Sequence, residues 1–353
     1  MVAPTPRVVV ILVNYQDYAT QHLGACYQSL LGQIYPRERW ALFVVDNDST
    51  AITRRAIAQR APRARILEVG ENLGWAGGNN AGIRTALQEV CEFVVALNMD
   101  TTVDPSWLER LVEYAEAHPH LHILQSKILL HGTGCINSLG GKIQFLGYGY
   151  CLRYAYEDAP LPDHDPIDFA SGASMLVRRE VFERIGLFRD EYFMYGEDLE
   201  FCWRARLAGF HIGVADKSIC HHRYDFTKIQ RALFYVERNR LTTMLTLPRL
   251  GTILLLLPGL ILFQCGALLY FTFRGWGRTA WALIGHFLRP ATWWRISRRR
   301  RELASRRVIR DAEIVRGFSG IIVFAEIRSR VFRYLINPLL WLYWTMVRWL
   351  IVW

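Results

Sequence analysis

Four short apolar runs in the first hundred residues constrain the fold more than any other feature of the sequence. They are continuous stretches of β-branched and aliphatic residues, at Val8–Val13, Leu42–Val45, Ile66–Val69 and Phe93–Leu97. Runs without polar alternation are typical of strands buried on both faces of a parallel sheet. The segments between them carry apolar residues at helical spacing. The sequence therefore predicts an α/β fold with an open, mostly parallel sheet and flanking helices.

Three of these runs end in polar residues. The first is followed by Asn14 and Tyr15, the second by Asp46 and Asn47, and the fourth by Asn98 and Asp100. Ligands of open parallel sheets bind beside the carboxyl ends of the strands, so we expect these side chains to converge on one crevice. Taken singly, each cluster could equally cap the next helix, because Asp and Asn are preferred N-cap residues.

A glycine-rich segment, Glu71–Asn80, follows the third run and precedes a predicted helix at Ala81–Leu87. Gly74, Gly77 and Gly78 would let the backbone approach a ligand closely, and the start of a helix offers free N–H groups to an anion. The alternative is a plain turn. The dinucleotide fingerprint G-x-G-x-x-G does not occur in this segment.

Asn98 and Asp100 form an N-x-D motif at the end of a predicted buried strand. A carboxylate spaced two residues from another oxygen ligand suits a hard divalent cation that also binds diphosphate oxygens. Asp104 could join this set, but Asp104 followed by Pro105 is better explained as the start of a helix.

Glu197 and Asp198 open a predicted helix that ends at Gly209. Acidic residues at a helix start are favoured by the helix dipole without any catalytic role. The two adjacent like charges and the aromatic residues around them favour a second interpretation. Both features raise a carboxylate pKa towards that of a useful general base.

His221 and His222 end a strand-like stretch formed by Ile212–Ala215 and Ile219 with Cys220. A histidine is most often structural, but imidazole is an acceptable ligand for manganese-type sites. Because the pair follows a metal-type Asp and a candidate base, a role as metal ligand stays open beside the structural one.

Cysteine content and charge argue against a disulfide-linked or zinc-binding protein and against a nucleic-acid-binding one. The seven cysteines are scattered without a C-x-x-C pair, which argues against a disulfide framework or a cysteine zinc site and favours a reducing cytosol. Residues 1–273 hold 26 basic and 28 acidic side chains, whereas residues 274–353 hold 16 basic and 4 acidic ones. The net charge of +10 thus belongs to the tail. Apolar segments flank it, so anionic lipids are a simpler partner than nucleic acid.

The tail predicts a membrane-associated helical domain at 250–353, after a first domain at 1–249. Leu250–Phe273 is 24 residues long without a charge, and it carries Pro258 and Gly259 in its middle. An ordinary span would place the Arg-rich segment 274–333 across the membrane from the first domain, against the positive-inside tendency. We therefore expect an apolar hairpin broken at Pro258, an amphipathic Arg-rich segment on anionic headgroups, and an apolar aromatic helix at 334–353; a single span is the alternative.

The ordered motifs resemble the inverting family 2 glycosyltransferases of the GT-A fold, in particular their rhamnosyltransferase-like branch. The matching pieces are VVVILVNY (8–15), VVDNDST (44–50), ENLGWAGGNNAGI (71–83), ALNMDTTVDPSWL (96–108), the segment 170–210, the His pair and ERNRL (237–241). The resemblance covers residues 7–250. This chain has Ala51 where the family often has an acid, and Asn98 where it has the first carboxylate of D-x-D.

The resemblance implies a role for each matching residue. The nucleotide-sugar pocket would be lined by Asn14, Tyr15, Asp46, Asn47, Asn72, Gly74, Gly78, Asn79 and Asn98. Asp100 would be the principal metal ligand, joined by His221 or His222. Asp198 would be the general base with Glu197 beside it, and Gly172, Trp203 and Arg204 would lie on the acceptor side.

The implied function is a hexosyl- or deoxyhexosyltransferase that needs Mn²⁺ or Mg²⁺. It would move a sugar from a nucleoside-diphosphate sugar to a lipid-linked saccharide in cell-surface polysaccharide assembly, at the cytoplasmic face of the cell membrane. The alternative is a catalytically silent, membrane-bound scaffold of the same fold. Apolar and amphipathic tails often pair, which leaves a homodimer open.

Overall fold

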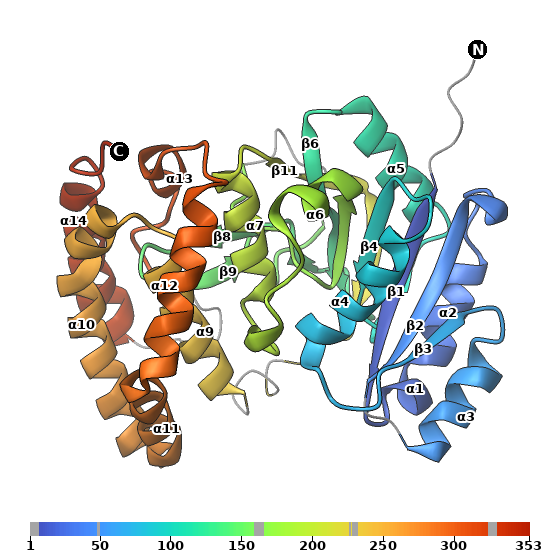
Figure 1. Cartoon of the computed structure of the whole chain (residues 1–353), viewed down its shortest axis with the longest axis horizontal. Helices are drawn as coiled ribbons and strands as arrows, with labels where there is room; N and C mark the ends of the chain where they lie inside the picture. The colour runs from blue at the N-terminus through green and yellow to red at the C-terminus, as the bar shows by residue number, and fades with distance from the viewer. Residues whose placement is uncertain (1–6, 48–49, 159–165, 226, 228–231, 324–329) are drawn as a thin grey trace. The chain divides into compact units, whose positions relative to one another are not determined.

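The computed structural model describes residues 7–47, 50–158, 166–225, 227, 232–323 and 330–353. The chain divides into two compact units (Figure 1). Unit 1 consists of residues 1–141, 151–202 and 210–225. Unit 2 consists of residues 142–150, 203–209 and 226–353.

Unit 1 is built on a mixed sheet in the order β3-β2-β1-β4-β10-β6-β11-β5, with β7 paired to β6. The strands are β1 (Val8–Tyr15), β2 (Trp40–Asn47), β3 (Arg65–Glu68), β4 (Phe93–Leu97), β5 (Thr101–Val103), β6 (Leu121–Leu130), β7 (Ile136–Ser138), β10 (Ser174–Arg178) and β11 (His211–His222). The first four are parallel, as predicted from the apolar runs, and β10 is antiparallel to both β4 and β6. Strands β8 (Gly141–Ile143) and β9 (Gly149–Cys151) form a separate pair.

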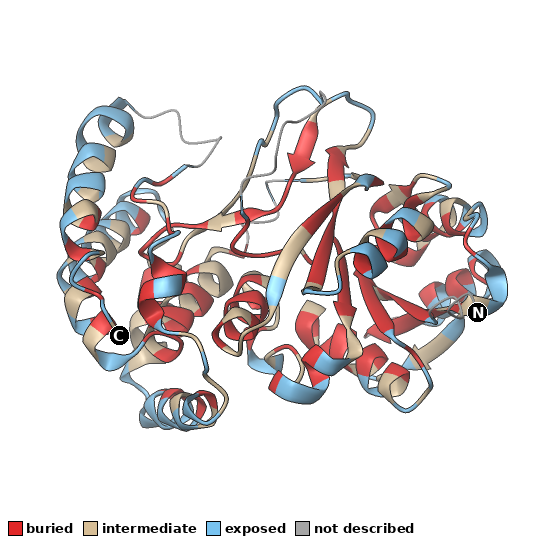
Figure 2. Ribbon diagram, turned by 90° about the horizontal axis from the view of Figure 1, so that it is seen from above, coloured by how far each residue is buried: buried red, intermediate tan, exposed pale blue. Residues whose placement is uncertain are grey.

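The predicted burial of the four runs holds for three of them. β1, β2 and β4 are almost entirely buried, whereas β3 lies at the edge of the sheet and is half-buried or exposed throughout (Figure 2). An edge strand has a neighbouring strand on one side only, and the side chains of β3 are not fully covered by helices either. The prediction that the run at 66–69 is buried on both faces is therefore wrong.

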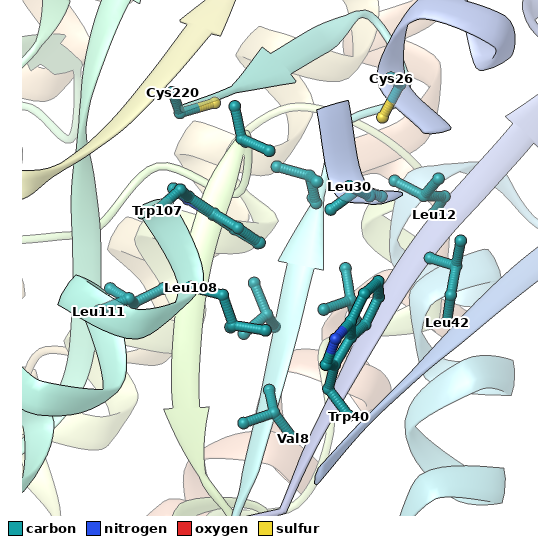
Figure 3. Packing of buried hydrophobic residues seen from close by; sticks show 14 of the residues in the cluster. Val8, Leu12, Cys26, Leu30, Trp40, Leu42, Trp107, Leu108, Leu111 and Cys220 are labelled. Carbon is teal, nitrogen blue, oxygen red and sulfur yellow. The ribbon is translucent and has the colours of Figure 1, made fainter. Parts of the chain in front are cut away.

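Helices cover both faces of this sheet. They are α1 (Tyr18–Gln21), α2 (Leu23–Leu31), α3 (Ala51–Arg60), α4 (Gly74–Leu87), α5 (Trp107–Ala117) and α6 (Arg179–Ile185), with short 3₁₀ turns η1 (Arg37–Arg39) and η2 (Asp190–Tyr192). Helix α7 (Glu197–Leu207) begins in unit 1 and ends in unit 2. Val10 and Leu12 of β1 belong to the core that α2 and α5 close, where Trp107 and Leu108 point towards the strands (Figure 3). Gly78 of α4 packs on Val13, on the opposite face.

Two predicted helix starts are wrong. Helix α4 begins at Gly74, seven residues before the predicted start at Ala81, so the glycine-rich segment lies mostly inside the helix. Helix α5 begins at Trp107 with Ser106 as its N-cap, so the Asp104 side chain does not cap it. The Asp104 carbonyl instead accepts a hydrogen bond from the Trp107 N–H.

Unit 2 is helical. Its elements are α9 (Leu233–Thr246), α10 (Leu250–Phe273), α11 (Gly277–Leu288), α12 (Pro290–Ala304), α13 (Asp311–Val315), the π-helical η3 (Phe332–Ile336) and α14 (Asn337–Val347). Helix α9 packs against α11 and α12. The helical unit therefore includes the chain from 226 onwards. The structural boundary lies before α9, whereas the sequence predicted it at 249/250.

The predicted apolar hairpin at 250–273 is also wrong, because α10 is one continuous helix with Pro258 inside it. An internal proline costs about 3 kcal/mol in a helix, through a lost hydrogen bond and a steric clash. Packing of α14 offsets this cost. The Tyr343 hydroxyl donates to the Leu255 carbonyl at 2.5 Å, and the Tyr343 ring lies against Gly259. Within the described residues, α10 is the one helix long and apolar enough to cross a membrane, judged by length and composition alone.

Candidate active site

The register of β1 and β2 brings the first two polar clusters together. Asn14 lies opposite Asp46, and Tyr15 lies opposite Asn47. The Asn14 amide donates to Asp46 Oδ1 at 3.4 Å, and both side chains are buried. Asn14 Oδ1 also accepts from the Ala19 N–H at 2.8 Å. Asn14 therefore holds the Asp46 carboxylate and also binds the backbone of α1, whose N-cap is Asp17.

Asn47 anchors the start of α4. Its Oδ1 accepts from the Leu73 N–H at 2.8 Å, and its Nδ2 donates to Asn72 Oδ1 at 3.3 Å and to the Gly74 carbonyl at 3.2 Å. Asn72 Oδ1 accepts from the Gly74 N–H at 2.9 Å. The Asn47 and Asn72 side chains therefore hold the loop after β3 against the end of β2. Asn47 has a structural role here, beside the predicted role in binding the nucleotide sugar.

The glycines at the start of α4 contact protein atoms, not open space. Gly74 has φ +68°, and a Cβ there would lie 2.3 Å from the Phe193 carbonyl. A Cβ at Gly78 would lie 2.6 Å from Val13 Cγ1. Close packing against Phe193 and Val13 thus requires glycine at both positions, and their role in binding a ligand stays a prediction.

Asn79 is buried within α4 and donates to the Trp75 carbonyl at 3.0 Å. Its Oδ1 is buried without a hydrogen-bond partner among the residues described. A buried amide oxygen without a donor is costly, and a partner outside the described protein would relieve that cost.

The Trp75 indole connects the metal motif to the candidate base. Its Nε1–H donates to Asn98 Oδ1 at 2.8 Å. Its ring also lies against Gly172, where a Cβ would be 2.5 Å from Trp75 Cζ2. The Gly172 N–H in turn donates to Asp198 Oδ2 at 3.1 Å. Asn98, Gly172 and Asp198 are therefore linked through one side chain.

His222, and not His221, is the histidine beside Asp100. His222 Nε2 lies 3.4 Å from Asp100 Oδ1, and both side chains are largely buried. His222 Nδ1 contacts Asn137 Oδ1 at 2.9 Å, so Asn137 holds the imidazole from the side opposite Asp100. His221 Nε2 instead contacts Asp104 Oδ1 at 3.0 Å. Only His222 of the pair therefore lies beside Asp100, and His221 lies beside Asp104.

The two acids at the start of α7 occupy different environments. Burial and then the neighbouring Asp198 charge raise the pKa of Glu197 to about 8, and Glu197 Oε2 has no hydrogen-bond partner in the described part of the chain. Burial also raises the pKa of Asp198, while the N–H groups of Gly172 and Leu199 oppose that shift. The Leu199 N–H donates to Asp198 Oδ1 at 2.8 Å. Both shifts agree with the predicted direction.

Trp203 and Arg204, predicted on the acceptor side, are both buried in unit 2. The Trp203 ring packs edge-on against Phe318, with the ring centroids 4.8 Å apart. Trp203 is therefore a core residue of that unit and offers no open face to an acceptor.

Two contributors to the site escaped the sequence argument. Trp75 lies in the glycine-rich segment, ahead of the helix predicted at Ala81–Leu87. Asn137, which orients His222, lies on the short strand β7, outside every motif of the sequence. Trp75 directly follows Gly74, the first residue of the helix, and an aromatic residue in that position is a signal that points to it. Nothing in the local sequence points to Asn137.

Comparison with known proteins identifies the family. The profile of glycosyl transferase family 2 matches residues 8–186, about half of the chain. The chain therefore belongs to glycosyl transferase family 2. Its fold is of the GT-A type: it is similar to the structure of GalNAc-T7 with UDP, GalNAc and Mn²⁺, with a TM-score of 0.55 at 14% identity over 69% of this chain and 48% of that one.

Two curated relatives match more than half of the chain. The low-salt glycan biosynthesis hexosyltransferase Agl10 of Haloferax volcanii is 30% identical over 207 residues, which is 58% of this chain and 63% of the relative. The N-acetylglucosaminyl-diphospho-decaprenol L-rhamnosyltransferase of Mycobacterium tuberculosis is 29% identical over 205 residues, 52% of this chain and 66% of the relative. The chain thus spans just under two thirds of each relative.

Proposed function

We propose that this protein is an inverting, metal-dependent glycosyltransferase that transfers a sugar from a nucleoside-diphosphate sugar to a lipid-linked saccharide. One observation carries the proposal: a single indole, Trp75, contacts both Asn98 of the N-x-D motif and Gly172, whose N–H holds the Asp198 carboxylate. A leaving diphosphate and an acceptor hydroxyl must meet at one anomeric carbon. A metal motif and a base joined through one side chain provide that proximity.

The donor set beside the motif fits Mn²⁺ or Mg²⁺. Magnesium-type cations are held by one or two protein ligands together with substrate phosphates, so a full protein cage is not required. The described residues contain no group of three or more His, Cys, Asp or Glu side chains that could hold a metal. Asp100 and Nε2 of His222 would supply the protein ligands, with Asn137 orienting the imidazole. When bound, such a cation neutralises charge on the diphosphate leaving group.

Asp198 is the residue placed to accept the proton of the acceptor hydroxyl. Its two oxygens are held by the Gly172 and Leu199 N–H groups, which fix the carboxylate in one orientation. The hydroxyl oxygen then attacks the anomeric carbon from the face opposite the leaving nucleoside diphosphate. Its proton passes to Asp198 as the C–O bond to the diphosphate breaks. One displacement inverts the anomeric configuration.

The helical unit supports a membrane-bound acceptor. Large apolar side chains are exposed along α10 and α14, among them Leu262, Phe273 and Trp341, each more than half exposed. Contiguous exposed apolar surface marks a contact with a membrane or a protein. Arginines of α12 would add contact with anionic headgroups, although Arg300 also binds the carbonyls at the end of α9. The rhamnosyltransferase relative is named for a decaprenol-linked acceptor, which agrees with a membrane-bound acceptor. We propose the cytoplasmic face of the cell membrane as the place of the reaction.

The proposal is tested by release of nucleoside diphosphate from a panel of nucleotide sugars. The detergent-purified full chain is incubated with Mn²⁺ or Mg²⁺ and a bacterial lipid extract, beside Asp198→Asn and the control Asp158→Asn, which removes a carboxylate paired with Lys127. We expect release from one donor that requires metal, persists in the control and falls by at least 100-fold in Asp198→Asn. Binding of a nucleoside diphosphate without release from any donor would instead favour the silent scaffold.

A further inference from the structure

Trp75 is the second residue of α4, and its position is fixed from several sides. The start of the helix is tied to β2 by Asn47, and the indole packs edge-on against Phe188 with the ring centroids 5.1 Å apart. A side chain that is fixed in this way also fixes the orientation of the group to which it donates a hydrogen bond. That atom is Nε1, which contacts the first residue of the N-x-D motif.

The contact decides which end of the Asn98 amide faces a ligand. An indole N–H can only donate, so the Asn98 atom that it meets must be the carbonyl oxygen Oδ1. Asn98 is half-buried, and no side chain in the described part of the chain accepts a hydrogen bond from its Nδ2. The amide N–H₂ group therefore stays available as a donor. An Asp at this position would offer acceptor oxygens only.

The same ring supports the loop that carries Gly172. A Cβ at Gly172 would overlap the indole, so only glycine allows the backbone to lie directly on the ring. The Gly172 N–H reaches the Asp198 carboxylate from that backbone. The indole thus has two separable functions: its N–H orients Asn98, and its six-membered ring supports the loop that orients Asp198.

We propose that Trp75 is a positioning residue that turns Asn98 into a hydrogen-bond donor towards an oxygen of the nucleoside diphosphate, and that its ring separately holds the Gly172 loop against Asp198. The inference rests on the proposed function and adds to it. Asn98 is assigned to binding the nucleotide through N–H, while metal binding is left to Asp100 and His222.

The two functions are separated by two substitutions in the full chain. Trp75→Phe keeps an aromatic ring beside the Gly172 loop, although a shorter one, and removes the N–H, so we expect affinity for nucleoside diphosphates to fall by about 3- to 10-fold. In that variant kcat should stay within about twofold of the wild type. Trp75→Ala removes the ring as well and should lower kcat at least tenfold. Binding is measured by calorimetry with UDP, dTDP and GDP in the presence of Mn²⁺, and kcat with the donor that the release assay identifies.

A double-mutant cycle with Asn98→Ala tests the coupling itself. Because Trp75 acts through Asn98, Trp75→Phe should cost less than about twofold in affinity when Asn98 is already Ala. Trp344→Phe is the matched control, since it removes an indole N–H that donates to the Phe318 carbonyl at 3.0 Å in unit 2, and it should leave nucleotide affinity unchanged.

The outcomes separate this inference from the proposed function. If the wild type binds a nucleoside diphosphate and Trp75→Phe binds it equally well, or if the two losses simply add, the role of Trp75 is refuted while the glycosyltransferase proposal stands. If no nucleoside diphosphate binds to the wild type, the proposed function itself fails, and the inference fails with it.

Discussion

Burial of Glu197 makes the stability of the protein depend on pH, and Glu197→Gln should remove that dependence. The side chain is 6% exposed and its pKa is raised from the ordinary value of 4.5 to about 8, first by burial and then by the Asp198 charge. Between these two values the unfolded chain has lost the proton while the folded chain keeps it. The folded state then binds more protons, so stability falls as pH rises through this window.

The size of the effect follows from the same two values. Between pH 5.5 and 8.5, the shift to about 8 corresponds to a loss on the order of 3 kcal/mol in the free energy of unfolding. For a unit of this size, 1 kcal/mol changes the melting temperature by roughly 2–4 °C. The wild type should therefore lose roughly 6–12 °C more than Glu197→Gln over this range, because glutamine cannot ionise.

The assay is thermal unfolding of the detergent-purified chain, followed by circular dichroism at pH 5.5, 7.0 and 8.5. Glu113→Gln is the control, because it removes an exposed carboxylate of α5 and should follow the wild type at every pH. Melting curves of wild type and Glu197→Gln that shift in parallel with pH would refute the reasoning. Glu197 would then be ionised in the folded protein or solvated by water.

Three further changes have defined outcomes. His222→Ala should weaken Mn²⁺ binding in the presence of nucleoside diphosphate by about 10-fold or more, whereas His221→Ala should change it less than threefold, as measured by electron paramagnetic resonance of free Mn²⁺. Gly78→Ala should lower the free energy of unfolding in urea by about 1–3 kcal/mol, because its Cβ would meet Val13; an unchanged value would contradict the close packing of α4. Leu262→Glu should reduce flotation with anionic vesicles, whereas Val90→Glu, at an equally exposed position of unit 1, should not; equal flotation of both would argue against contact through α10.

The strand framework could be predicted because it follows from one-dimensional signals. Uninterrupted apolar runs give β1, β2 and β4, and strands of equal direction bring their polar ends to one edge, so the pairing of Asn14 with Asp46 follows directly. The Glu197–Asp198 helix start and its stop at Gly209, which has φ +92°, were equally local. Local sequence carries this information because it concerns residues a few positions apart.

The remaining features depend on contacts that are distant in the sequence. Adjacent strand residues point to opposite faces, and β11 has an irregular register between Ala215 and Ile219. Which of His221 and His222 faces Asp100 therefore depends on an irregularity that the apolar pattern does not show. The start of α4 at Gly74 depends on the Phe193 carbonyl beside it, and no local rule for glycine separates that case from a turn.

Pro258 is the opposite case, in which a sound local rule was overridden. Proline usually ends or kinks a helix, and the hairpin was expected for that reason. Tyr343 of α14 lies 85 residues further along the chain, beside Gly259, and its contacts stabilise a continuous helix. Packing from a distant helix cannot be read from the 24 residues of α10 themselves.

The anomeric configuration of the product tests the central claim most directly. The donor that the release assay identifies is incubated with the enzyme, metal and lipid acceptor, and the new linkage is assigned by NMR from its one-bond C1–H1 coupling constant. A single displacement assisted by Asp198 requires the configuration opposite to that of the donor, and none of this product should form with Asp198→Asn. A product that retains the donor configuration would contradict the single displacement and the assignment of Asp198 as its base.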